Sequence, residues 1–144
     1  MPIMFNRLFE RLSNGPATAH EELGELHLAV AFVLVACMSA DYKFKPEETR
    51  AVADGLYVLF GFDRQKSNRL IARAVAARQI EPSIFASAMI IARMGSETFK
   101  QQFREIVAQV ASADGELHDY EKDLLERLSL ILNRSEDAKL RAAA

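Results

Sequence analysis

The sequence predicts an all-α protein, a single compact bundle of about seven helices. Apolar residues recur every three or four positions through most of the 144 residues, and no stretch alternates with the period of two expected of a strand. Glycine and proline residues separate the amphipathic stretches, where they end one helix and precede the next. The composition is 50% hydrophobic and 26% charged, as in ordinary globular domains. We therefore expect residues 1–144 to form one domain.

The first four predicted helices cover residues 3–12, 21–39, 46–60 and 64–77. The first is short and amphipathic, whereas the second becomes almost wholly apolar, as a helix at the centre of a bundle does. Pro46 favours the start of the third helix, because proline lacks the backbone N–H that would be left unbonded there. Gly61 offers a break after the third helix, and Asp63 is expected to cap the fourth.

Three more helices are predicted over residues 83–94, 97–110 and 118–132. Pro82 and Ser83 mark the start of the fifth helix, and Gly95 marks its end. Ser96 is expected to cap the sixth helix with its hydroxyl group. The helices between about residues 21 and 133 form the expected core of the domain, to which the N-terminal helix over 3–12 is added.

Cysteine and apolar residues are distributed in a way that excludes several classes of protein. Cys37 is the only cysteine, so neither an intrachain disulfide nor a metal site built from several cysteines is possible. The longest apolar run, Leu28–Met38, has 11 residues, whereas a membrane-spanning helix needs about 20. Charged residues within the first 12 positions interrupt the apolar core that a signal peptide requires. We therefore expect a soluble, cytoplasmic protein that does not span a membrane.

The net charge is −2, but basic residues predominate in the middle of the chain, where residues 64–104 include 8 basic and 2 acidic side chains. On the predicted helix near Arg64–Arg78, Arg69 and Arg73 lie one turn apart, a spacing that can hold phosphates. No aromatic residues accompany them, and a solvated helix face explains the charges equally well. We therefore expect no nucleic-acid partner.

The N-terminal helix carries an apolar stripe together with two basic residues. The stripe and its neighbours are Met4, Phe5, Leu8, Phe9, Arg7 and Arg11. Such a helix can lie on a membrane surface, which would place the protein peripherally at the inner membrane. At this length we favour the alternative, in which the stripe packs onto the bundle.

Two segments resemble each other when one is shifted by 73 positions. Each consists of an apolar helix, the tripeptide Ser-Ala-Asp, a short connection and a glutamate in the first turn of the next helix. The acidic pair is Asp41 and Glu48 in the first copy, and Asp114 and Glu121 in the second. This shared order predicts a pseudo-two-fold repeat of helix pairs. Antiparallel packing of the two pairs would bring the four carboxylates together.

The second copy carries a family resemblance. The segment Ala113-Asp114-Gly115-Glu116, followed by Glu121 and an amphipathic helix, resembles the signature of tellurite-resistance TerB-like domains, and the likeness covers roughly residues 25–136. The N-terminal domain of a membrane-anchored DnaJ-type co-chaperone is also similar. The resemblance implies about seven helices, a bacterial cytoplasmic location and a role in tellurite resistance or stress. It also implies clustered acidic residues that bind a divalent metal ion or a protein partner.

We define the acidic corner as six carboxylates: Asp41, Glu48, Asp114, Glu116, Asp119 and Glu121. Calcium, magnesium and manganese prefer oxygen ligands of this kind. The first copy departs from the family pattern, because Tyr42 and Lys43 stand where the second has Gly115 and Glu116, which weakens any cation site there. An EF-hand is excluded, since its sixth and twelfth positions counted from Asp114 lack the required glycine and glutamate.

A purely structural interpretation of these carboxylates is also open. Glu48 and Glu121 fall near the third position of their helices, where a glutamate stabilises free backbone N–H groups and the positive end of the helix dipole. Asp41 and Asp114 would then end the preceding helices and bond to the connecting turns.

Few residues favour catalysis. No Ser-His-Asp or Cys-His group is visible, and none of the 6 glycines belongs to a phosphate-binding loop. We therefore predict a non-enzymatic stress-response module that binds a protein partner. A membrane-associated protein is one candidate for that partner. The alternative is a carboxylate-dependent metalloenzyme that uses the same acidic corner. Such an enzyme would need a cleft beside the carboxylates.

Overall fold

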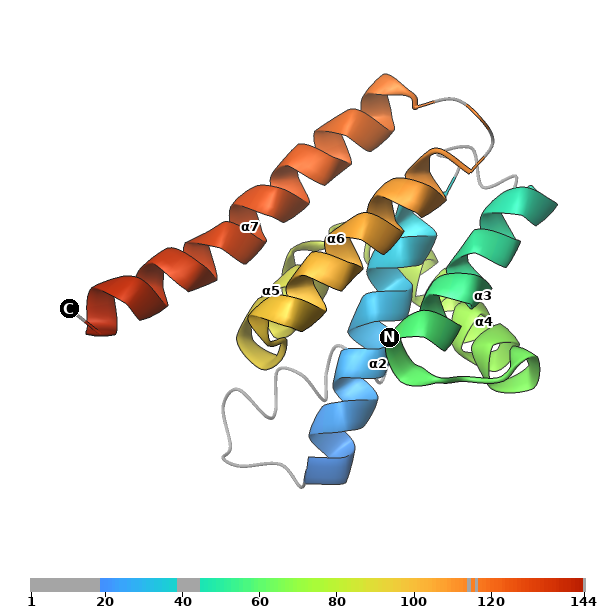
Figure 1. The fold of residues 1–144 in the computed structure, drawn as a ribbon. Helices are drawn as coiled ribbons and strands as arrows, with labels where there is room; N and C mark the ends of the chain where they lie inside the picture. Colours follow the sequence, from blue (N-terminus) through green and yellow to red (C-terminus); the bar gives the residue numbers. More distant parts are fainter. Residues whose placement is uncertain (1–18, 39–44, 114, 116, 144) are drawn as a thin grey trace.

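The computed structural model describes residues 19–38, 45–113, 115 and 117–143. In this part of the chain the fold consists of six helices without a strand (Figure 1), which confirms the predicted all-α class. The helices are α2 (Ala19–Ala36), α3 (Pro46–Phe60), α4 (Arg64–Ile80), α5 (Phe85–Met94), α6 (Glu97–Ala111) and α7 (Asp119–Ala143). The predicted helix over residues 3–12 lies outside the described residues, so a total of about seven stays a prediction.

Helix α2 is the centre of the bundle, as its apolar sequence predicts. Every residue from Leu28 to Met38 is buried. The helix packs mainly against α4 and α5 and also contacts α3 and α6. A helix that is apolar on all sides can be covered only when neighbours surround it, and these four helices do so.

The helix boundaries follow the predicted capping residues. The Asp63 carboxylate accepts a hydrogen bond of 2.8 Å from the backbone N–H of Lys66, and the Ser96 hydroxyl accepts one of 3.1 Å from that of Phe99. Pro46 is the first residue of α3. Gly61, the capping residue that follows the last helical residue, adopts the left-handed conformation with φ of 72°. This conformation favours glycine, because a side chain would be strained there.

Several boundaries differ from prediction: α2 covers Ala19–Ala36 rather than residues 21–39, and α4 continues to Ile80 rather than ending at residue 77. Helix α5 begins at Phe85 rather than at residue 83, because the Ser83 hydroxyl accepts the backbone N–H of Phe85 and so precedes the helix. Helix α7 extends to Ala143, well beyond the predicted end at residue 132. No glycine or proline follows residue 132 to end it.

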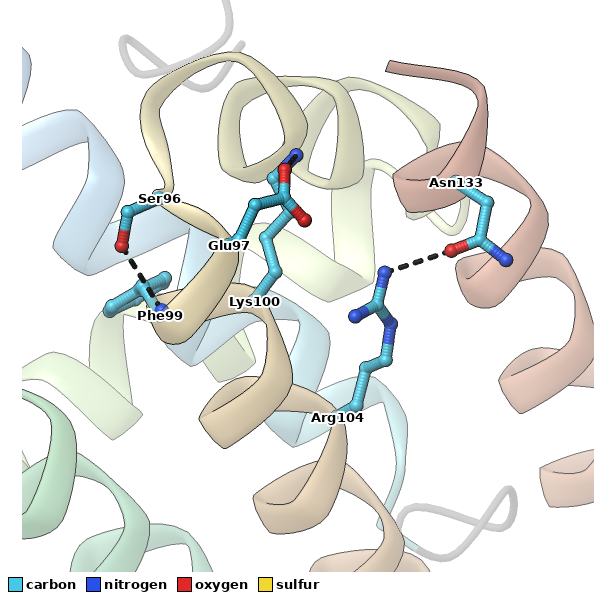
Figure 2. A network of polar contacts seen from close by, with 6 residues as sticks. All are labelled: Ser96, Glu97, Phe99, Lys100, Arg104 and Asn133. Atoms are coloured by element: carbon cyan, nitrogen blue, oxygen red, sulfur yellow. Dashed lines mark hydrogen bonds and ion pairs between the residues drawn. The ribbon is translucent and has the colours of Figure 1, made fainter. Parts of the chain in front are cut away.

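Helices α3 and α6 approach each other closely at Gly55. A Cβ atom added to this glycine would lie 2.5 Å from Ile106 Cγ2, so only glycine permits the observed separation. Farther along the bundle, α6 and α7 are joined by a hydrogen bond of 2.9 Å from the Arg104 guanidinium to the Asn133 side-chain oxygen (Figure 2). The middle of α6 is thus joined to α7 by a polar contact.

None of the helices in the described ranges combines the length and the apolar character that crossing a membrane would require.

Candidate functional site

The first turn of α7 lies against the C-terminal end of α2. The Tyr120 hydroxyl donates a hydrogen bond of 3.5 Å to the Ala36 carbonyl oxygen, which is one of the last carbonyl groups of α2. Glu121, the next residue, is only 5% exposed. The start of α7, where the acidic corner was predicted, is therefore packed into the bundle.

Arg78, near the end of α4, connects this turn to the rest of the bundle. Its side chain is buried, and one guanidinium nitrogen donates a hydrogen bond to the Pro82 carbonyl oxygen. The other terminal nitrogen lies 3.3 Å from the Tyr120 hydroxyl oxygen. The guanidinium carbon is 5.5 Å from the centroid of the Phe32 ring, within the range of a cation–π contact. Arg78 thus links α2, α4 and α7.

Cys37 is buried beside the same group of residues. The pKa of its thiol is raised from 9.0 to about 12, mainly because the thiol is buried and also because of the charge of Glu121, whereas the charge of Arg78 acts to lower it. The opposing effects of Glu121 and Arg78 place both charges near the thiol. A thiol with a pKa this high holds its proton at neutral pH and does not act as a nucleophile.

The raised pKa predicts a loss of stability at alkaline pH. The folded chain holds the Cys37 proton more tightly than the unfolded chain, so this contribution to stability is fully present below about pH 9 and is lost as the pH rises toward about 12. The loss should reach ~1.4 kcal/mol per pH unit. Urea unfolding between about pH 8 and pH 11 should show a steeper decline for the parent chain than for Cys37→Ala. If the free energy of unfolding declined equally with pH in the parent chain and in Cys37→Ala, the prediction would be wrong.

The six residues of the acidic corner fall into three groups. Glu48 and Glu121 are buried, at 2% and 5% exposure, and each is the third residue of its helix. Asp119 is fully exposed, with a carboxylate oxygen 3.9 Å from Lys122 Nζ. The other members, Asp41, Asp114 and Glu116, lie outside the described residues.

The burial of Glu48 and Glu121 fits both interpretations of the sequence. As residues of the first turn, both carboxylates lie where the helix dipole favours negative charge. The His118 imidazole nitrogen Nε2 also lies 4.0 Å from the Glu121 carboxylate. Among the residues with described positions, no three His, Cys, Asp or Glu side chains come close enough to hold a metal ion. A cation site at this corner would therefore depend on Asp41, Asp114 or Glu116.

The described part of the surface contains two pockets, which we compare with the positions of the buried carboxylates of Glu48 and Glu121. One, of about 580 Å³, lies between α7 and the connection from α4 to α5. The other, of about 690 Å³, lies between α3 and the start of α4. Neither Glu48 nor Glu121 is on the wall of either pocket.

Sequence reasoning missed Arg78, because it treated the basic residues of α4 as a solvated face. Arg69 and Arg73 are indeed exposed, but Arg78 is 8% exposed. Its spacing contained the signal, since Arg78 follows the buried residues Leu70 and Ala74 at intervals of four and therefore lies on their face of the helix.

The fold and this corner define a small all-helical domain in which the starts of two helices each bury a glutamate. The chain belongs to the family of the tellurite resistance protein TerB, whose family model matches residues 27–144. No curated protein and no solved structure gave a significant match. The similarity to the N-terminal domain of a DnaJ-type co-chaperone therefore stays a prediction.

Proposed function

We propose that this chain is a non-enzymatic module of the tellurite-resistance type, whose acidic corner binds a divalent cation and thereby controls docking of a protein partner. Membership of the TerB family supports the class of module. The buried Glu121 at the start of α7 is the observation that carries the site, since the segment with Asp114 and Glu116 leads directly into that turn.

The chemistry of the corner favours a hard cation. Hard divalent cations prefer several oxygen ligands, and carboxylates supply them. The chain buries one carboxylate at the third position of α3 and another at the third position of α7, at 2% and 5% exposure. Carboxylate oxygens from these turns and from Asp114 and Glu116 would suit calcium, magnesium or manganese.

A binding role is also supported by the state of the cysteine. Cys37 is buried and its thiol pKa is raised to about 12, so it does not supply a nucleophile. We extend the proposal to a cytoplasmic location and to a partner associated with the inner membrane, in line with the expectation from the sequence.

Calorimetric titration of the metal-stripped chain with calcium, magnesium, manganese and zinc tests the proposal. We expect saturable heat with at least one of these ions, and stabilisation by about 2.7 kcal/mol when the free ion is at a hundred times its dissociation constant. Asp114→Asn and Glu116→Gln should each weaken binding about tenfold or more, which corresponds to ~1.4 kcal/mol.

The matched control is Asp123→Asn, because Asp123 is an exposed carboxylate of α7 outside the acidic corner. This variant should bind the ion as the parent does. Glu121→Gln distinguishes the structural interpretation: a lower melting temperature of the metal-free chain with unchanged affinity would make Glu121 a helix-terminal residue only. Absence of heat with all four ions would refute the cation site.

A further inference from the structure

An open apolar groove runs along α7, on the side that faces the connection between α4 and α5. The residues of α7 in its wall are Tyr120, Asp123, Leu124, Arg127, Leu130 and Ile131. They recur every three or four positions and so form one continuous face about three turns long. Pro82, Ser83, Ile84 and Phe85 form the opposite wall.

The groove leaves large apolar side chains in contact with water. Leu130 is 64% exposed, Phe85 59% and Tyr120 42%. A contiguous apolar groove bordered by charged residues is typical of a surface that binds another element. A groove three turns long suits an amphipathic helix that presents residues at positions i, i+4 and i+7 or i+8.

The chain itself contains a segment with these properties. Within residues 3–12, the apolar side chains are Met4, Phe5, Leu8, Phe9 and Leu12, at the spacing of one helix face. An isolated helix this short is unstable in water, so it would need an apolar surface to form. From Met4 to Leu12 such a helix would be about 12 Å long, comparable with the ~16 Å between Tyr120 and Ile131 on α7.

We propose that residues 3–12 form an amphipathic helix that docks in the groove between α7 and the α4–α5 connection of the same chain. The segment precedes the region that matches the TerB family, which begins at residue 27. The docking involves none of the carboxylates of the acidic corner, so it can be tested independently of the proposed cation site.

The length of the connecting chain permits this docking. From Leu12 to Ala19, the first residue of α2, an extended chain covers up to ~24 Å. Helix α2 has 18 residues and is about 27 Å long. Its far end contacts Tyr120 at one end of the groove, through the hydrogen bond to the Ala36 carbonyl oxygen. Helix α5 packs against both α2 and α7, so the groove is about one helix away from α2.

The rim of the groove carries a carboxylate that a basic residue of the segment can approach. Asp123 is exposed beside the groove and lies 3.2 Å from Arg127 on the same helix. Arg7 and Arg11 are one turn apart in the segment and border its apolar stripe on one side. Either guanidinium can approach the Asp123 carboxylate when the stripe faces the groove.

Tryptophan fluorescence tests this proposal in the full-length chain. The protein contains no tryptophan, so Phe9→Trp introduces a single reporter in the segment. We expect blue-shifted emission and several-fold weaker quenching by acrylamide than in the urea-unfolded chain. Adding Leu130→Glu should place a charge in the groove, shift the emission to the red and raise the quenching several-fold. Phe85→Glu, on the opposite wall, should have the same effect.

The matched control is Val58→Glu, because Val58 is 61% exposed on α3, away from the groove, and Leu130 is 64% exposed. This variant should leave emission and quenching unchanged. Water-exposed emission in the Phe9→Trp chain would overturn the proposal and leave the segment free for a membrane or another protein. Buried emission that neither groove substitution changes, or that disappears on dilution as for a segment exchanged between copies, would also overturn it.

Discussion

Replacement of Arg78 by alanine is expected to destabilise the folded chain by about 2–4 kcal/mol. The side chain is 8% exposed and forms hydrogen bonds to the Pro82 carbonyl oxygen and to the Tyr120 hydroxyl. Its removal leaves the Pro82 carbonyl oxygen and the Tyr120 hydroxyl without this donor and opens a void beside the Phe32 ring. Because Arg78 connects α4 to the first turn of α7, the loss should also loosen the turn that holds Glu121.

Urea unfolding of Arg78→Ala measures this effect, with Arg69→Ala as the matched control. Arg69 lies on the same helix and is exposed, so its removal should change stability by no more than ~0.5 kcal/mol. Tyr120→Phe should lower the stability by about 1 kcal/mol. In a double-mutant cycle this loss should become smaller in the Arg78→Ala background, where only the hydrogen bond from the Tyr120 hydroxyl to the Ala36 carbonyl oxygen is left to lose. Equal stabilities of Arg78→Ala and Arg69→Ala would show that the contacts of Arg78 with Pro82 and Tyr120 do not stabilise the fold.

The sequence was sufficient to predict the helices whose boundaries depend on local chemistry. The Asp63 and Ser96 caps form the expected hydrogen bonds, since capping involves only residues within one turn. The central position of α2 was predictable for a similar reason: an apolar run of this length can be covered only from all sides. The correspondence between the two helix pairs, by contrast, depends on low sequence similarity and stays a prediction.

The burial of individual charged side chains was not predicted. Charged residues had been counted along the sequence, without asking which face of a helix each one occupies. Lys100, Phe103 and Val107 share one face of α6, and all three are buried. Glu121 likewise precedes the buried residues Leu124 and Leu128 at helical spacing. A charged residue in register with an apolar stripe therefore indicates burial, and its partner on another element can be identified only from the fold.

Lys100 provides the second large effect. Its side chain is fully buried, and its Nζ lies 3.4 Å from a carboxylate oxygen of Glu97, which is 62% exposed (Figure 2). Lys100→Glu would bury a carboxylate next to Glu97, with like charges three residues apart. We expect a loss of at least ~3 kcal/mol at neutral pH, or failure to fold. Burial would raise the pKa of the new carboxyl, so the loss should diminish as the pH is lowered and the group takes up its proton.

Lys100→Met separates the charge from the packing. Methionine has an unbranched side chain that can occupy the path of the lysine stem past Gly95. Because Glu97 is largely exposed, it can be solvated by water once the ammonium is gone. We therefore expect the methionine variant to match or exceed the parent in its urea midpoint, since the buried charge no longer needs to be desolvated. If methionine destabilised the chain as strongly as glutamate, the Lys100–Glu97 pair itself would be what stabilises the start of α6.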